Sequence, residues 1–301
     1  MGNADRNGRR QRPARRRGSP ADHDRPSRAA RTPRLNGSSF TIPMGSDMPY
    51  KISFQLYSAR NFPPLERQLE GLAAIGYDAV EPWLPAYEAS AVEFRRKIDA
   101  AGLACYGFHL PFKGLVADPR RFIDIAKTIG AWLLIPPYLE PQDRPTTADG
   151  WRAVGRELGR VREIVAAEGL KLAWHNHDFE YRLLPDGSRP IDLLFEGAGS
   201  EVGYEIDFAW VVRGGGDPVT ELRHWKDRLY AIQVKDTAPA GTTAEGGWTA
   251  MGDGVVDWKA LWPLFSETPA DHLVVEHDEP ADWRVLAQRS YDYLVKLGAR
   301  G

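Results

Sequence analysis

From Tyr50 onward the chain repeats one pattern: a short run of β-branched or aromatic residues, a polar loop, and a longer stretch with apolar residues at helical spacing. Short apolar runs bounded by polar residues are typical of buried strands, and the longer spacing predicts amphipathic helices. The predicted strands cover residues 51–56, 78–83, 104–109, 132–135, 171–177, 202–207, 229–234 and 272–276.

A helix is predicted after each of these strands, and prolines mark several of the helix starts. The first helix begins after Pro63 and Pro64 and ends near Gly76. The others cover about 91–101, 119–129, 151–168, a stretch from 190 onward, 218–225, 258–265 and 283–297.

Eight strand–helix units in about 250 residues are what a (β/α)8 TIM barrel requires. A doubly wound open sheet shares this alternation. However, no glycine-rich phosphate fingerprint follows any predicted strand, and polar residues end nearly every strand. We therefore expect an α/β fold with a single TIM-barrel domain over residues 48–301.

Residues 1–47 have no hydrophobic periodicity and consist largely of Arg, Pro, Gly, Ser and Ala. Such a segment cannot bury enough apolar surface to fold, so we predict a disordered Arg-rich N-terminal tail. A nucleic-acid arm and a targeting peptide are alternatives, but the apolar centre of a secretory signal is missing. Because Met44 and Met48 stand just before the first strand, we expect the natural start at one of them.

Composition and charge narrow the class of protein. The apolar fraction of 43% and charged fraction of 27% are ordinary for a globular domain. Residues 1–47 hold eleven Arg and four Asp, or +7, so the remaining residues carry −9 of the total −2. An acidic body argues against nucleic acid as a partner. The single cysteine, Cys105, forms no intrachain disulfide, and no run approaches the roughly 20 apolar residues that span a bilayer. We expect a cytoplasmic protein without membrane contact.

Residues 172–181, LAWHNHDFEY, hold the densest group of chemically active side chains. Alternation along a strand puts His175 and His177 on one face about 6–7 Å apart, with Glu180 just beyond. Two imidazoles and a carboxylate supply metal ligands and proton carriers that work near neutral pH. The alternative is a polar rim in which the histidines only form hydrogen bonds.

The carboxyl ends of barrel strands meet around one mouth, so distant residues converge there. A donor set of His175, Asp207 and Glu276 suits Mn, Co, Zn, Fe or Mg, which would polarise a ketone or hydroxyl. We expect Glu276, Glu180 and His177 to move protons. The polar strand ends are Glu81, His109, His175, His177, Asp207, Gln233, Lys235 and Glu276.

Other side chains have two open roles. Lys235 supplies a cation for a developing oxyanion, or it forms a salt bridge with Asp236. Trp174, Trp210 and Trp258 stack on a sugar or pack in the core. We include Trp210 and Trp258, together with His109 and Glu81, among the predicted substrate-binding residues.

Five segments together resemble the sugar phosphate isomerase/epimerase group of the xylose isomerase-like TIM barrels. The resemblance runs from Met48 to the end of the chain. It implies one divalent metal at the barrel mouth and proton transfer next to a sugar carbonyl. The segments are WHNHDFEY at 174–181, EIDFAW at 205–210 with GDP at 216–218, VKD at 234–236, GDGVVDW at 252–258 and VEHD at 275–278.

The chain departs from this group at the predicted metal site. The fifth-strand ligand is often Glu and falls here on His175, whereas the seventh-strand ligand is usually His and is here Gln233. Gln233 therefore completes a predicted set with His175, Asp207 and Glu276, as a weaker ligand than imidazole. Trp210 replaces a His found in many epimerases.

The expected function is an isomerase or epimerase of a sugar or polyol derivative that uses metal-assisted proton transfer. A lyase or dehydratase acting on a keto-sugar or inosose would use the same proton abstraction. A catalytically idle sugar-binding barrel is the alternative from another class. The expected partner is a small-molecule sugar or polyol, with a homo-oligomer possible and neither nucleic acid nor membrane involved.

Overall fold

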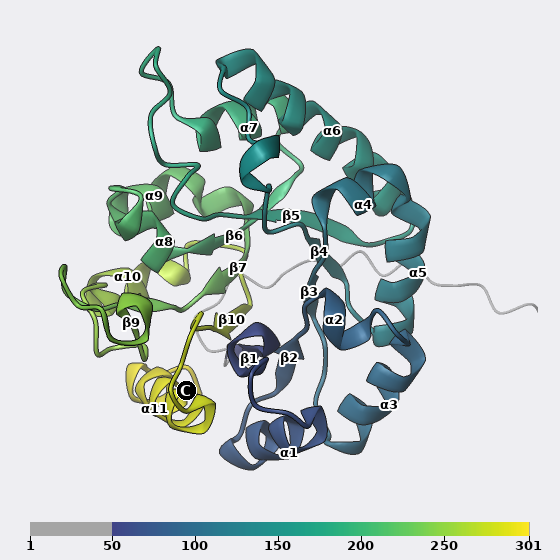
Figure 1. Cartoon of the computed structure of the whole chain (residues 1–301), viewed down its shortest axis with the longest axis vertical. Helices are drawn as coiled ribbons and strands as arrows, with labels where there is room; N and C mark the ends of the chain where they lie inside the picture. The colour runs from purple at the N-terminus through teal and green to yellow at the C-terminus, as the bar shows by residue number, and fades with distance from the viewer. Residues whose placement is uncertain (1–49, 301) are drawn as a thin grey trace, which may run out of the picture. The chain divides into compact units, whose positions relative to one another are not determined.

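A computed structural model describes residues 50–300 of the chain. Eight parallel strands form one sheet that curls into a nearly closed barrel, in the order β2-β1-β10-β7-β6-β5-β4-β3. In Figure 1 the strands lie around the centre of the picture and the helices around the outside. The strands are β1 (Lys51–Gln55), β2 (Ala79–Glu81), β3 (Gly107–His109), β4 (Leu133–Ile135), β5 (Lys171–His175), β6 (Gly203–Asp207), β7 (Leu229–Gln233) and β10 (His272–Val275).

The barrel closes between β2 and β3 through a single parallel bridge from Ala79 to Ala104. The backbone N–H of His109 also donates to Pro82 across this seam, at 2.8 Å. Elsewhere the register aligns the strand ends, with Gln55 beside Glu81 and Asp207 beside Gln233. The predicted α/β barrel is therefore confirmed, with its C-terminal strand ends gathered at one mouth.

Eleven helices are described between residues 50 and 300, and the predicted ones are all among them. Aspartate side chains cap several N-termini: Asp118 accepts from Arg121 N, and Asp217 from Thr220 N. The helices are α1 (Leu65–Ile75), α2 (Leu84–Tyr87), α3 (Ala91–Ala100), α4 (Phe112–Ala117), α5 (Pro119–Ile129), α6 (Ala148–Ala167), α7 (Pro190–Ala198), α8 (Phe208–Arg213), α9 (Pro218–Trp225), α10 (Trp258–Phe265) and α11 (Trp283–Leu297).

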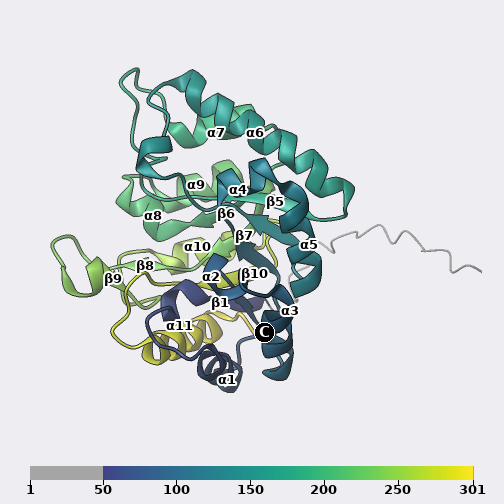
Figure 2. The ribbon, with the colours of Figure 1, turned by 45° about the vertical axis from the view of Figure 1, so that its right-hand side comes forward.

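The sequence pattern missed a small antiparallel hairpin, β8 (Asp236–Thr237) paired with β9 (Trp248–Thr249). Figure 2 shows this hairpin reaching out from the barrel beyond β7. Its strands have two residues each, too few for a periodic signal. The hairpin brings Trp248 from outside the eight strands to the rim of the mouth.

Apolar side chains fill two spaces, one between the sheet and the helices and one inside the barrel. The interior cluster is small and consists of Leu133, Ile135, Ala173 and Ala231. It leaves room inside the barrel for buried polar side chains, among them Glu81, Glu205 and His272. Cys105 is buried and unpaired, as predicted.

Within residues 50–300, no helix has the length and apolar character needed to cross a membrane. The prediction of a tail over residues 1–47 concerns a segment outside the described part of the chain.

Candidate active site

A cavity of about 920 Å³ opens at the C-terminal ends of the strands. Its ionisable side chains include His109, His175, His177, Glu276 and Asp278. Four of the eight predicted strand-end residues thus line this cavity: His109, His175, His177 and Glu276. Aromatic residues form much of the rest of the lining: Tyr57, Trp83, Phe112, Tyr138, Trp210 and Trp248.

Lys235 lies directly behind this lining and is completely buried. Its Nζ lies 2.7 Å from Glu276 Oε2 and 2.8 Å from Asp278 Oδ2. Both indole rings above it, Trp210 and Trp248, lie within 4.7 Å of the ammonium. Lys235 thus pairs with two carboxylates that face the cavity, and not with Asp236 as one sequence interpretation proposed.

Asp207, Gln233 and Glu276 converge beside this lysine. One terminal amide atom of Gln233 lies 2.7 Å from Asp207 Oδ2 and 3.3 Å from Glu276 Oε2. If that atom is nitrogen, it donates to both carboxylates. If it is the carbonyl oxygen, three oxygen acceptors meet at one point, which a hard cation would satisfy. Two carboxylates and an amide are residue types that also hold divalent ions, and Gln233 must present its oxygen to do so.

Burial and charge perturb the acids at the mouth. Burial raises the pKa of Asp207 to about 8 and raises that of Glu276 as well, while Lys235 acts in the opposite direction. Burial lowers the pKa of Lys235, but Asp278, Glu276 and Asp207 outweigh it and raise that pKa overall. Lys235 therefore stays protonated, and Glu276 is more basic than an exposed glutamate.

A second group of charged residues lies next to the mouth inside the barrel. His109 Nε2 lies 3.0 Å from Glu205 Oε1 and 3.1 Å from Glu81 Oε1. Burial lowers the pKa of His109, but the two glutamates outweigh it and raise it to about 10. His175 Nδ1 lies 3.2 Å from the same Glu205 oxygen, and burial keeps this second imidazole neutral by lowering its pKa.

The LAWHNHDFEY segment positions its side chains differently from the prediction. β5 ends at His175, so His177 lies in the following loop, although the two rings still approach to 5.2 Å. Asn176 between them exchanges two hydrogen bonds with the backbone of Asp207, accepting from its N–H and donating to its C=O. The end of β5 is thereby fixed to the end of β6.

Glu180 was predicted to move protons, but it is fully buried beneath this loop. Its two oxygens accept from Trp174 Nε1 at 3.1 Å and from His177 N at 2.9 Å. Glu180 is absent from the cavity lining, and its hydrogen bond supports the backbone at His177. Burial raises its pKa to about 8 in spite of these donors.

The two tryptophans predicted to bind substrate lie in different places, one in the cavity lining and one in the core. Trp210 lines the cavity, with its ring 5.0 Å from that of His177 and 4.5 Å from that of Trp248. Trp258 is 1% exposed and its Nε1 donates to Asp236 at 2.8 Å, away from the cavity. This placement corrects the predicted sugar-stacking role of Trp258, which is structural.

Sequence reasoning missed several residues at the site. Asp278 follows the eighth strand in a loop, where no periodicity marks it, yet it pairs with Lys235. Trp248 comes from the hairpin. Glu205 could have been found, because it stands two residues before Asp207 on one strand and so shares its barrel-facing side. Glu81 and His109 were predicted to bind substrate; His109 reaches the cavity, whereas Glu81 lies beneath it.

The fold and this site define a (β/α)8 barrel with an acidic, aromatic-walled mouth. The family described as xylose isomerase-like TIM barrel matches residues 69–297, and the chain belongs to that family.

Curated relatives match part of the chain. A rhizopine catabolism protein, MocC, from Rhizobium meliloti is 30% identical over 166 residues, which cover 50% of each protein. An inosose dehydratase from Lacticaseibacillus casei is 24% identical over 185 residues, covering 52% of this chain and 58% of the dehydratase. The chain thus spans only about half the length of the curated relatives it matches.

Solved structures share the fold over most of the chain. A sugar phosphate isomerase/epimerase from Parabacteroides distasonis has a TM-score of 0.72 at 20% identity, covering 87% of this chain and 99% of its own. A xylose isomerase-like TIM barrel protein from Mycobacterium smegmatis, solved in complex with magnesium, has a TM-score of 0.64 at 16% identity, covering 82% and 96%. These similarities support the fold.

Proposed function

We propose that the protein is an isomerase or epimerase of a sugar or polyol derivative and transfers a proton at the carbon next to a carbonyl. The carrying observation is the convergence of Asp207, Gln233 and Glu276 beside Lys235, directly under an aromatic-walled cavity. Aromatic walls suit the apolar faces of sugar rings, and the polar floor suits their hydroxyls.

Glu276 is the proposed base. It faces the cavity, burial raises its pKa, and Lys235 fixes its carboxylate at 2.7 Å. His177 is proposed to exchange a proton with a substrate oxygen, because its imidazole lines the same cavity and is kept neutral by burial, which lowers its pKa. A positioned acid and base of this kind accelerate proton transfer by about 10²- to 10⁴-fold each.

A divalent ion would be held by Asp207, Gln233 and Glu276, with His175 as the remaining predicted ligand. When bound, it would polarise a substrate carbonyl or hydroxyl and so acidify the neighbouring C–H. Oxygen donors favour Mg or Mn, whereas inclusion of His175 would favour Zn or Co. Whichever ion binds, the contact with Lys235 sets the orientation of the Glu276 carboxylate.

A lyase that removes water from a keto-sugar or inosose is the second candidate. It is favoured by the similarity to inosose dehydratase, and it uses the same first step, removal of a proton next to a carbonyl. The two reactions differ afterwards, because an isomerase returns a proton whereas a lyase expels a hydroxyl group.

The test is a panel of ketoses, inososes and 3-keto glycosides incubated with the protein and Mn²⁺ in D₂O. An isomerase or epimerase gives a product of unchanged composition that carries solvent deuterium, whereas a lyase gives a product lighter by one water. Glu276→Gln should reduce either rate by on the order of 10²-fold or more. Ligand binding without turnover in the wild type would identify an idle binding barrel and refute the proposal.

A further inference from the structure

Three buried residues converge inside the barrel below the mouth: Glu81 on β2, Glu205 on β6 and His272 on β10. One ligand atom of each lies within 4.8 Å of the other two. Their exposed fractions are 1%, 0% and 0%. They are therefore isolated from solvent in a place where an uncompensated charge is costly.

Each of the three has a polar atom without a partner among the described residues. His109 approaches Oε1 of both glutamates, and Gln55 also donates to Glu81 Oε1 at 2.8 Å. The other oxygen of each, Oε2, has no hydrogen bond, and neither has His272 Nε2. Three buried polar atoms without a hydrogen-bond partner in one cluster need an explanation, since buried polar groups are normally paired.

His272 is oriented as metal-binding histidines are. Its Nδ1 lies 3.3 Å from Asp271 Oδ1, which leaves Nε2 unpaired. A carboxylate behind an imidazole fixes its ring and tautomer and makes the far nitrogen a better ligand. The rings of Tyr106 and Trp132, at 5.9 and 5.6 Å from the His272 ring, form an apolar shell around it.

The backbone makes room for Glu81 in this space. A Cβ atom on Gly107 would lie 2.7 Å from Glu81 Oε2, so only glycine permits the carboxylate to occupy its place. Gly107 stands on β3 beside the weakly paired seam of the barrel. The free oxygen is thus accommodated by a glycine and left without a donor.

We propose that Glu81, Glu205 and His272 bind a divalent cation inside the barrel, separate from any ion at the mouth. Two carboxylate oxygens and one imidazole nitrogen are a donor set that zinc accepts, with a water completing four-coordination. The site is structural, because it lies beneath the cavity and none of its three ligands lines that cavity. It ties β2, β6 and β10 together across the barrel.

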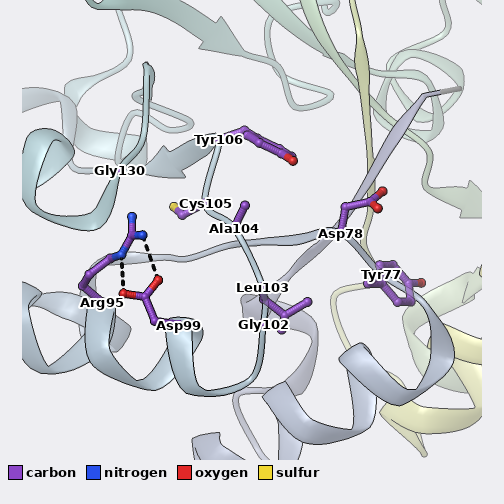
Figure 3. A pocket seen from close by; sticks show the side chains of 10 residues that line it. All are labelled: Tyr77, Asp78, Arg95, Asp99, Gly102, Leu103, Ala104, Cys105, Tyr106 and Gly130. Atoms are coloured by element: carbon purple, nitrogen blue, oxygen red, sulfur yellow. Dashed lines mark hydrogen bonds and ion pairs between the residues drawn. The ribbon is translucent and has the colours of Figure 1, made fainter. Parts of the chain in front are cut away.

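A second cavity, of about 570 Å³, lies near this cluster. Residues that precede β2, β3 and β4 line it together with Arg95 and Asp99 of α3, as Figure 3 shows. Tyr106 lines this cavity and also packs against His272, with 5.9 Å between the two rings.

The test measures zinc and thermal stability in the full chain. A variant with Asp207→Asn and Glu276→Gln removes the two carboxylates proposed to hold an ion at the mouth and leaves Glu81, Glu205 and His272 intact. After chelation and addition of Zn²⁺ alone, this variant should hold about one zinc by mass spectrometry of the metal, and its melting temperature should rise by several degrees. Absence of bound zinc and of the melting shift would overturn the proposal.

Single substitutions in the wild type provide the matched comparison. Glu81→Gln and His272→Gln should each lower the zinc content by about one per chain, whereas Glu276→Gln should leave the interior ion in place. An unchanged zinc content in both interior variants would also overturn the proposal, and would assign the unpaired atoms to a buried water or a shared proton. If zinc is absent only from the mouth, the interior variants still report on the interior ion. The proposal for the interior site and the proposal for the mouth can therefore be refuted independently.

Discussion

Two carboxylates lie close to Lys235: Asp236 is its neighbour in the chain and Glu276 is its ion-pair partner. They differ in the hydrogen-bond donors that surround them. The Asp236 carboxylate accepts five hydrogen bonds, from the backbone N–H groups of residues 237, 252, 254 and 256 and from Trp258 Nε1. Glu276, which pairs with Lys235, meets an ammonium and one amide atom. A carboxylate surrounded by fixed donors organises the fold, whereas one with few donors keeps lone pairs for chemistry.

The same contrast explains the GDGVVDW motif at residues 252–258. A Cβ on Gly254 would collide with the Asp236 carboxylate, and Gly252 has a φ of +88°, so both glycines are needed for the loop to wrap around it. Asp257 then caps α10 by accepting from Ala260 N. A motif that resembles an active-site signature therefore builds a support for the site.

The largest expected effect on stability comes from Lys235→Met. It leaves the buried Glu276 and the partly buried Asp278 without their shared cation, and loss of one partner of a buried pair costs about 3–5 kcal/mol of unfolding free energy. Urea unfolding at pH 8 measures this cost. Lys226→Met, at a surface pair with Glu267 of 3.7 Å, is the control and should change stability by less than about 1 kcal/mol. If both substitutions lowered the unfolding free energy equally, the ion pairs at the mouth would stabilise the fold no more than a surface pair does.

Asp236→Ala should cost about 2–3 kcal/mol, because it strands several buried N–H donors in a loop that can partly rearrange toward water. The effect should appear in the melting temperature, with a smaller loss of activity than Glu276→Gln causes. Asp253→Ala, in the same loop but paired with Arg289 near the surface, is the matched control. A loss of activity without a loss of stability would place Asp236 in the chemistry.

Glu180→Gln tests a buried carboxylate that has two neutral donors and, within residues 50–300, no cation in ion-pair contact. Its folded-state pKa of about 8 lies above the ordinary value of 4.5, so the folded protein holds this proton more tightly than the unfolded chain. The resulting stabilisation is complete below about pH 4.5 and is lost as the pH rises through 8. Relative to wild type, the variant should therefore gain on the order of 3 kcal/mol between pH 5 and pH 8. Parallel stability curves for the two proteins would mean that Glu180 is ionised throughout.

Removal of residues 1–47 should have the smallest effect. This segment has no apolar pattern with which to pack on the barrel, so a chain starting at Met48 should melt within about a degree of the full chain. Scanning calorimetry of both chains is sufficient. A drop of several degrees would show that the segment docks on the barrel.

Periodicity predicted the eight strands and their helices because each unit buries one face, and burial leaves a repeating mark in the sequence. It predicted the mouth as far as strand ends define it. It failed for Trp258 and Glu180, since residue type alone does not tell whether a polar atom meets a buried partner or a substrate. Asp278 lies in a loop and Trp248 in a two-residue strand, and neither segment is long enough to show a spacing that tells where its side chains point.

His272 was missed for a different reason. It stands at the first position of its strand, at the end of the barrel away from the mouth. Polar residues at the carboxyl ends of strands mark the mouth, and His272 lies at the opposite end of its strand. Its role depends on Asp271 and on two glutamates of other strands, and that combination exists only after folding.

Asn176 has a further consequence for the mouth. By accepting from the N–H of Asp207 and donating to its C=O, its side chain adds one rung to the ladder between β5 and β6 beyond the last backbone pair. The two strand tips cannot separate without breaking both bonds. The Asn176 amide thus holds the segment that carries His175 and His177 against the end of β6, and the positions of the two histidines depend on this side chain as well as on the sheet.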